Sequence, residues 1–221
     1  MLEIASKPSG NLAANSVSLT PIGGSAKRLV DIVLATFGIV ILLPLFSLCL
    51  LGTFLSSPGS VIFRHRRVGF QGRRFECLKF RTRAPCVDKL LHEHLSANPQ
   101  AKEKWEETRK LRHDTRMMLF GTIMHKTSLD ELPQLFNVLK GDMSIVGPRP
   151  MTDDEIEQYA HRVSAYLACR PGITGPWQIS GRSGTSYSTR VTFDDAYARN
   201  WSLLMDVKIM LGTVLDSDDA Y

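Results

Sequence analysis

The sequence predicts an α+β protein that is mostly helical, has one small β-hairpin, and sits on a membrane through an N-terminal helix. Three patterns predict this class. Residues 29–55 are almost entirely apolar, residues 74–81 alternate with the period of a strand, and residues 132–139 carry an apolar stripe at helical spacing. The 221 residues, 43% of them hydrophobic, suffice for one domain and one membrane element.

Composition narrows the kind of partner. The formal net charge of +5 suits anionic lipid headgroups and nucleotide diphosphates. Nucleic acid is disfavoured because the basic segment has few interleaved aromatic side chains beyond Phe75 and Phe80. Four cysteines without CxxC spacing predict neither a zinc site nor a disulfide framework. Residues 1–24 show no periodicity and predict a disordered lead rather than a secretory signal.

The apolar run is long enough to span a bilayer, for which about 20 residues suffice. Its flanks are basic at both ends, with Lys27 and Arg28 before it and several arginines after it. A spanning helix carries its basic residues mainly at the cytoplasmic end. Pro44 removes a helix hydrogen bond and introduces a bend. We therefore expect a re-entrant membrane helix over residues 25–57, kinked at Pro44, with an ordinary single-pass anchor as the alternative.

A basic β-hairpin is predicted next. Residues 61–63 and residues 74–81 are β-rich and are joined by a connection that contains two glycines. We expect its outer basic residues to touch lipid headgroups, at about 1 kcal/mol each, and Lys79 and Arg81 to point into a site. The alternative is a basic face that only rests on anionic lipid.

Residues 84–110 predict a solvated surface helix, on which His92 and His94 face different ways and make a poor metal pair. Arg116 follows, and together with Asp114 it either steadies a substrate phosphate or forms a plain ion pair. The next segment predicts a helix in which Leu119 and Ile123 belong to the core.

Two adjacent carboxylates, Asp130 and Glu131, stand at a predicted helix start. Ser128 and Glu131 fit a capping box, so the acids could serve only the helix end. Arg149 has a proline on each side, which restricts its backbone and presents its guanidinium at low entropic cost. A carboxylate pair together with a held arginine indicates a site that handles phosphate with help from a metal.

The remaining chain predicts two further helices around a glycine- and proline-rich loop. Thr152 and Glu155 fit a capping box, for a helix that runs to about residue 168. The loop at residues 170–182 offers planar donors or is only a turn, and residues 183–190 are interpreted as a flexible lid or specificity segment. The amphipathic residues 200–215 predict a helix at the membrane interface, with buried core as the alternative.

These motifs resemble the signature of the bacterial polyprenyl-phosphate phosphoglycosyl transferases, monotopic sugar transferases that start exopolysaccharide and O-antigen assembly. The resemblance covers residue 27 to about residue 215 and is closest to the galactose-1-phosphate transferases of rhizobial exopolysaccharide synthesis. It rests on SLDELPQLFNVLKGDMSIVGPRP from Ser128 and RPGITGPWQISGR from Arg170. Departures from the family pattern are His65 for Gln, Thr82 for Ser, Arg83 for Met, and Leu43 for the Ser that often precedes the membrane proline.

The resemblance implies a catalytic domain at residues 58–221, with interfacial helices, on the cytoplasmic face of the bacterial inner membrane. Asp130 matches the nucleophile that takes a sugar phosphate from a UDP-sugar and releases UMP, before undecaprenyl phosphate attacks the aspartyl phosphate. Glu131 matches its partner at Mg²⁺, and both carboxylates are candidate metal ligands. The implied substrate- and phosphate-binding residues are Lys79, Arg81, Arg116, Arg149, Arg170, Gln178 and Arg182.

The expected sugar is galactose, with glucose and N-acetylated sugars left open, as is a homodimer. A rival function is a non-catalytic, membrane-tethered assembly protein that binds anionic lipid. That rival explains the charge and the apolar run, but it gives no reason for the acid pair beside the proline-framed Arg149.

Overall fold

The computed structural model describes residues 20–56, 59–83, 118–157, 159, 163–179 and 187–215. Its helices are α1 (Gly24–Ile41), α2 (Leu43–Ser56), α5 (Leu119–Lys126), α6 (Gln134–Lys140), α7 (Asp153–Glu157), α8 (Val163–Leu167), α9 (Tyr187–Asn200) and α10 (Leu203–Leu215), with 3₁₀ turns η1 (Phe70–Gly72) and η2 (Leu129–Glu131). Its strands are β1 (Ile62–Val68), β2 (Arg74–Phe80), β3 (Ser144–Val146) and β4 (Gly172–Thr174).

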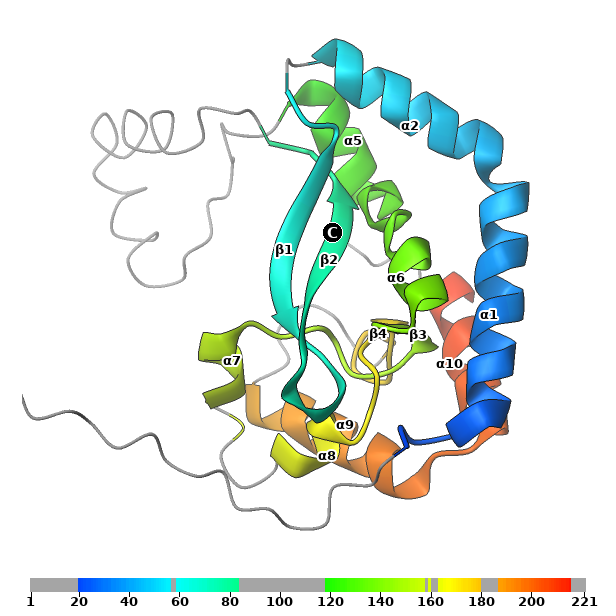
Figure 1. Ribbon diagram of the computed structural model, residues 1–221, viewed down its shortest axis with the longest axis vertical. Helices are drawn as coiled ribbons and strands as arrows, with labels where there is room; N and C mark the ends of the chain where they lie inside the picture. Colours follow the sequence, from blue (N-terminus) through cyan, green and yellow to red (C-terminus); the bar gives the residue numbers. More distant parts are fainter. Residues whose placement is uncertain are drawn as a thin grey trace, which may run out of the picture.

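The mostly helical α+β class and the hairpin are confirmed (Figure 1). β1 and β2 pair antiparallel from Ile62 opposite Phe80 to Val68 opposite Arg74. A second sheet, which the sequence did not indicate, consists of β3 and β4 in parallel. α5 and α6 lie beside the hairpin, and α1 and α2 form an outer arc beyond them (Figure 1). The predicted helix at residues 84–110, with His92 and His94, lies outside the described residues.

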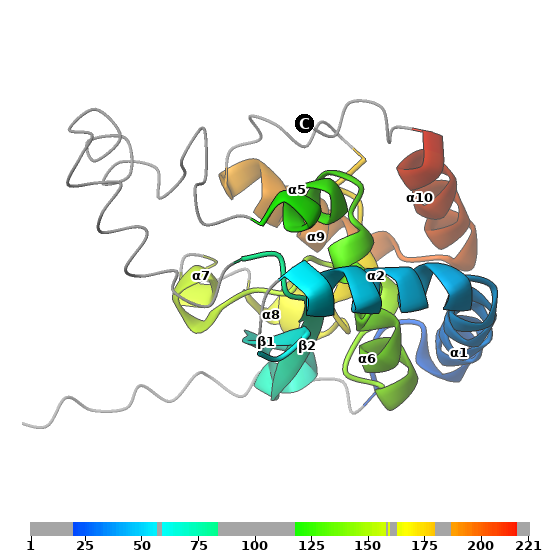
Figure 2. The same ribbon diagram turned by 90° about the horizontal axis from the view of Figure 1, so that it is seen from above.

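α1 and α2 are the two halves of the apolar run. No single helix among the described residues is long and apolar enough to cross a membrane, whereas this pair meets that test together, with a bend of 66° between the halves. The break is at Leu42, and Pro44 follows in the first turn of α2, where its missing N–H leaves Val40 without a helical donor. Figure 2 views the bent pair from above, with α10 beside α1.

The two basic residues that precede the apolar run face the inside of the protein. Lys27 is buried, and its ammonium lies 2.5 Å from a carboxylate oxygen of Asp206 on α10. Arg28 donates to the carbonyls of Val138 and Leu139 at the end of α6. Both cations are therefore committed to contacts inside the protein, and they do not bear on membrane topology.

The remaining charge on α1 also faces the protein. Asp31 is buried and accepts hydrogen bonds from the Ser144 hydroxyl and the Ile145 amide, both at 2.9 Å, so it fixes α1 to β3. The chain before α1 is attached as well, because the Ile22 amide donates to the Ala168 carbonyl. The predicted lead thus ends in ordered backbone from residue 20 onward, and residues 1–19 lie outside the described part.

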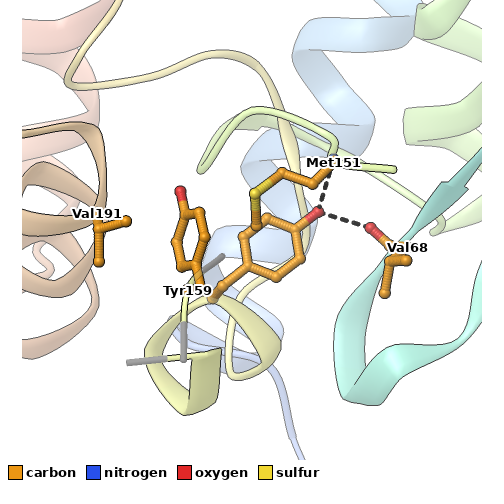
Figure 3. Packing of buried hydrophobic residues seen from close by; sticks show 5 residues of the cluster. Val68, Met151, Tyr159 and Val191 are labelled. Atoms are coloured by element: carbon orange, nitrogen blue, oxygen red, sulfur yellow. Dashed lines mark hydrogen bonds between the residues drawn. The ribbon is translucent and has the colours of Figure 1, made fainter. Parts of the chain in front are cut away.

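A tyrosine-centred core holds the segment that follows β3 (Figure 3). The Tyr166 hydroxyl donates to the Val68 carbonyl at 2.6 Å and accepts from the Met151 amide at 3.1 Å. Tyr159 packs edge-on against Tyr166, and Val191 of α9 closes the cluster. The end of β1 and the chain just after Pro150 are therefore held against each other by a buried hydroxyl.

The helix predicted to run from Thr152 to about residue 168 begins as expected but is broken. The capping box is confirmed, since the Thr152 amide donates to the Glu155 carboxylate at 2.8 Å and the Glu155 amide donates to the Thr152 hydroxyl at 3.3 Å. α7 ends at Glu157, and α8 starts only at Val163.

Replacing Lys27 by Met is expected to lower the free energy of unfolding by about 3–5 kcal/mol, because the change leaves the buried Asp206 carboxylate without its cation. Thermal unfolding of the detergent-solubilised protein measures the effect. Arg64→Gln is the matched control, since Arg64 pairs with Glu76 at 3.5 Å on the surface and such pairs contribute at most about 1 kcal/mol. Equal melting temperatures of the two variants would contradict a structural role for the buried pair.

Candidate active site

The acid pair lies in η2, a 3₁₀ turn between α5 and α6, and not at the start of the longer helix. Ser128 precedes the turn with φ +56° and makes no side-chain cap, so the capping box predicted for Ser128 and Glu131 is wrong. α6 begins at Gln134, after Pro133. A left-handed backbone at a residue other than glycine is strained, and such strain gathers at functional sites. Because the acids precede α6 and no capping bond forms at Ser128, neither carboxylate serves as a helix cap.

The two carboxylates have different surroundings. Asp130 is 4% exposed, and one of its oxygens lies 3.7 Å from Nδ1 of His125 in the last turn of α5. Glu131 is more open and forms an ion pair with Lys79 of β2, with 2.6 Å between Nζ and Oε1. The structure thus brings Lys79 to the acid pair as expected. His125 was missed by the sequence reasoning, although its place just before the acid pair was a usable signal.

The amide of Asn137 sets the position of Lys79 relative to Glu131. Asn137 is buried on α6, where its Oδ1 accepts from the Leu78 amide at 3.0 Å and its Nδ2 donates to the Glu76 carbonyl at 2.8 Å. The side chain therefore pairs with β2 as a neighbouring strand would. Since Lys79 follows directly, this contact fixes the distance between β2 and the turn that carries the acids.

Arg149, Lys79 and Glu131 all influence the electrostatics of one buried thiol on the hairpin. Burial raises the pKa of the Cys77 thiol on β2 to about 11; the charges of Lys79 and Arg149 oppose this shift and that of Glu131 adds to it. All three groups are therefore within electrostatic reach of one thiol. At that pKa Cys77 remains protonated near neutrality, and it is no candidate nucleophile.

The other predicted phosphate ligands make contacts elsewhere. Arg81 places its guanidinium beside Gly59, at the start of β1. Arg170 donates to the Gly141 carbonyl at 2.9 Å, and Gln178 donates to the Ile173 carbonyl at 3.1 Å. Burial lowers the pKa of Arg170, and the charge of Arg28 adds to this effect. Phosphate binding by these three residues stays a prediction. Arg116 and Arg182 lie outside the described residues.

The glycines of the two motif loops serve a contact between the loops themselves. A side chain on Gly172 would collide with the Gly147 backbone, and one on Gly147 would collide with the backbone of residues 170–172. The Gly172 amide donates to the Pro148 carbonyl at 2.8 Å, and the Gly147 amide donates to the Thr174 carbonyl at 2.9 Å. The loop that carries Arg149 and strand β4 are therefore joined backbone to backbone.

A divalent cation fits the acid pair as a partly hydrated ion. Within the described ranges, no three His, Cys, Asp or Glu side chains gather where they could hold a metal. Asp130 and Glu131 would then contribute two carboxylates, and this suits Mg²⁺, which keeps several waters and is commonly held by one or two carboxylates together with substrate phosphates.

A buried carboxylate next to one that is ion-paired with a lysine forms a site of the kind that serves transfer of a phosphorylated group. The family described as bacterial sugar transferases matches residues 22–217, and the chain belongs to that family. It is therefore an enzyme of the sugar-transferase class, and the family predicted from its motifs is confirmed.

Three curated relatives illustrate the range of the family. The exopolysaccharide production protein ExoY of Sinorhizobium fredii is 48% identical over 197 residues, which cover 89% of this chain and 87% of the relative. The undecaprenyl-phosphate galactose phosphotransferase of Salmonella typhimurium is 46% identical, over 88% of this chain and 41% of its own length. The UDP-glucose:undecaprenyl-phosphate glucose-1-phosphate transferase of Escherichia coli is 39% identical, with the same two shares.

Replacing Asn137 by Ala is expected to lower the kcat/KM of sugar transfer roughly 10–100-fold, because β2 loses the two bonds that hold Lys79 opposite Glu131. The double variant Asn137→Ala/Lys79→Met should then lose no more than Lys79→Met alone, a result that a merely destabilising change would not give. Asn200→Ala is the control, since Asn200 is exposed and bonds only its own helix. Additive losses in the double variant would contradict positioning through Lys79.

Proposed function

We propose that this enzyme transfers a sugar-1-phosphate, with galactose-1-phosphate the expected group, from a UDP-sugar to undecaprenyl phosphate as an initiating step of exopolysaccharide synthesis. The observation that carries the proposal is the acid pair itself, whose two carboxylates are held in a strained turn and are not used for helix capping. The relatives named for exopolysaccharide production and for galactose phosphotransferase activity support the substrate class.

The surroundings of the acids suggest their roles. Asp130 is buried and adjoins no lysine or arginine among the ion pairs of the described residues, so its carboxylate suits attack on phosphorus. One of its oxygens bonds to the phosphorus that bears the sugar, the bond from this phosphorus to the bridging oxygen breaks, and UMP leaves. An oxygen of undecaprenyl phosphate then attacks the same phosphorus, and Asp130 is released as a carboxylate.

Glu131 and Lys79 serve the charge balance of both steps. Mg²⁺, when held by Asp130 and Glu131, supplies neutralisation of the diphosphate. Lys79 keeps the Glu131 carboxylate in place through the 2.6 Å ion pair, and Arg149 offers an exposed guanidinium for phosphate oxygens.

Exposed apolar side chains support association of the enzyme with a membrane. They gather mainly on α1, α2, α5 and α10, and the more exposed examples are Leu29, Val40, Leu55, Leu119, Leu204, Val214 and Leu215. Leu119 is 85% and Ile123 is 53% exposed, so their prediction as core residues is wrong. We propose that the bent pair enters the cytoplasmic leaflet of the inner membrane and returns, with α5 and α10 at the interface. The acid pair, which begins four residues after the end of α5, would then meet the lipid phosphate at the membrane surface.

Asp130→Asn is expected to abolish both half-reactions, with a loss of about 10³-fold or more, because an amide cannot form the phosphosugar intermediate. Glu131→Gln should chiefly raise the Mg²⁺ concentration that is required. UMP release from UDP-galactose by detergent-solubilised protein, with and without undecaprenyl phosphate and Mg²⁺, measures turnover, and exchange of labelled UMP into UDP-galactose measures the first half-reaction.

UMP release by the Asp130→Asn variant would contradict the covalent route. Turnover with another UDP-sugar but not with UDP-galactose would keep the reaction class and replace the sugar. Absence of turnover by the native enzyme with every UDP-sugar would favour the rival function, a membrane-tethered assembly protein that binds anionic lipid.

A re-entrant pair places both of its ends on one side of the membrane. Cysteines introduced singly at Ser25 and at Ser60, both exposed, should therefore react with a membrane-impermeant maleimide only in inside-out vesicles. Reaction of one position from each side would show a spanning helix. All four native cysteines are replaced to keep the background low; Cys49, Cys77 and Cys169 are buried, and Cys86 lies outside the described residues.

A further inference from the structure

Trp177 is flanked by two guanidinium groups from distant parts of the chain. Its indole is 5% exposed and lies in the turn after β4. The Cζ atom of Arg190, on α9, is 4.5 Å from the ring centroid, and the Cζ atom of Arg149, in the loop after β3, is 5.7 Å from it. Three segments thus converge to place two positive charges around one aromatic ring.

Both guanidinium groups retain unused donors. Nε of Arg190 is buried and has no hydrogen-bond partner. No hydrogen bond or ion pair joins either arginine to another residue in the described part of the chain. A buried donor without an acceptor is costly, and two cations that contact the same ring repel each other. An anion bound between them would relieve both costs.

Asp194, one helical turn after Arg190, does not supply that anion. Its carboxyl accepts a hydrogen bond from the Tyr159 hydroxyl at 2.6 Å. Burial raises the pKa of Asp194 to about 7, although this hydrogen bond and the charge of Arg190 act in the opposite direction. The carboxyl is therefore committed to Tyr159 and neutralises Arg190 only in part.

The same contacts hold the two arginines in fixed positions. Tyr159 packs against Tyr166, whose hydroxyl binds the Met151 amide two residues after Arg149 (Figure 3). α9 and the loop that carries Arg149 are thus linked through one buried network. The prediction of residues 183–190 as a flexible segment is wrong for its last part, because α9 begins at Tyr187 and includes Arg190.

We infer that Arg190 and Arg149, held on Trp177, form a diphosphate-binding site that takes the two phosphates of the nucleotide donor. This inference rests on the proposed function for the identity of the donor. Guanidinium groups bind phosphate oxygens through paired N–H donors, and two of them match the two phosphates of a diphosphate. Because Arg190 covers the indole, Trp177 positions guanidinium groups here and does not stack on the uracil base.

The site suits a soluble diphosphate better than a lipid phosphate. The large exposed apolar side chains lie mainly on α1, α2, α5 and α10, and none of those described for α9 belongs to them. A lipid headgroup would be expected beside such side chains, because its acyl chain has to remain in the bilayer. Arg190 is therefore assigned to the nucleotide and not to undecaprenyl phosphate.

The test is UDP binding by the full-length, detergent-solubilised protein, measured by isothermal titration calorimetry. Arg190→Gln is expected to weaken UDP binding about 10–100-fold and to leave any binding of uridine unchanged, because uridine lacks phosphates. Arg190→Lys, which keeps the charge without the paired donors, should give an intermediate affinity. Arg199→Gln is the matched control, since Arg199 is exposed on the same helix and pairs with Asp195, and it should bind UDP as the native protein does.

Three outcomes would overturn the inference: native affinity for UDP in both Arg190 variants, no UDP binding by the native protein, or loss of binding to anionic vesicles in place of UDP binding. The proposed function fails separately. If the native protein binds UDP through Arg190 but turns over no UDP-sugar, the diphosphate site stands and the transfer reaction is wrong.

Discussion

The fold depends on a buried ion pair between its first helix and its last. The ammonium of Lys27 lies against Asp206, whose carboxylate also accepts from the Tyr197 hydroxyl at 2.8 Å and the Trp201 indole at 3.1 Å. Arg28 and Asp31 extend this attachment to α6 and β3. All three charged residues of α1 therefore face the protein, which leaves its opposite face apolar. Charge pairing and an exposed apolar surface coexist on one helix because they occupy different sides.

A series of direct contacts connects α1 to the acid pair. α1 fixes α6 through Arg28, α6 fixes β2 through Asn137, and β2 presents Lys79 to Glu131. α1 and the turn that carries the acid pair are thus connected through directional hydrogen bonds as well as through apolar packing. The geometry of the acids is consequently sensitive to how the first helix is seated on the domain.

The sequence predicted those elements that depend on interactions between residues close together in the chain. The hairpin and the helix after the acid pair follow from periodicity, and the capping box of Thr152 and Glu155 forms as expected. The identical pattern at Ser128 fails because Ser128 takes a left-handed backbone ahead of Pro133, a choice that spacing does not encode. The buried pairing of Lys27 was not predicted because its partner is 179 residues away, and Arg190 was missed because a ring shared between distant segments leaves no spacing signal.

The backbone contact between Gly147 and Gly172 has a consequence for turnover. Because neither position has room for a side chain, the loop that carries Arg149 and strand β4 meet with no side chain between their backbones. The loop and the strand therefore form one rigid unit and do not separate from each other during turnover. In the proposed transfer reaction, the nucleotide product would therefore have to leave past some other segment.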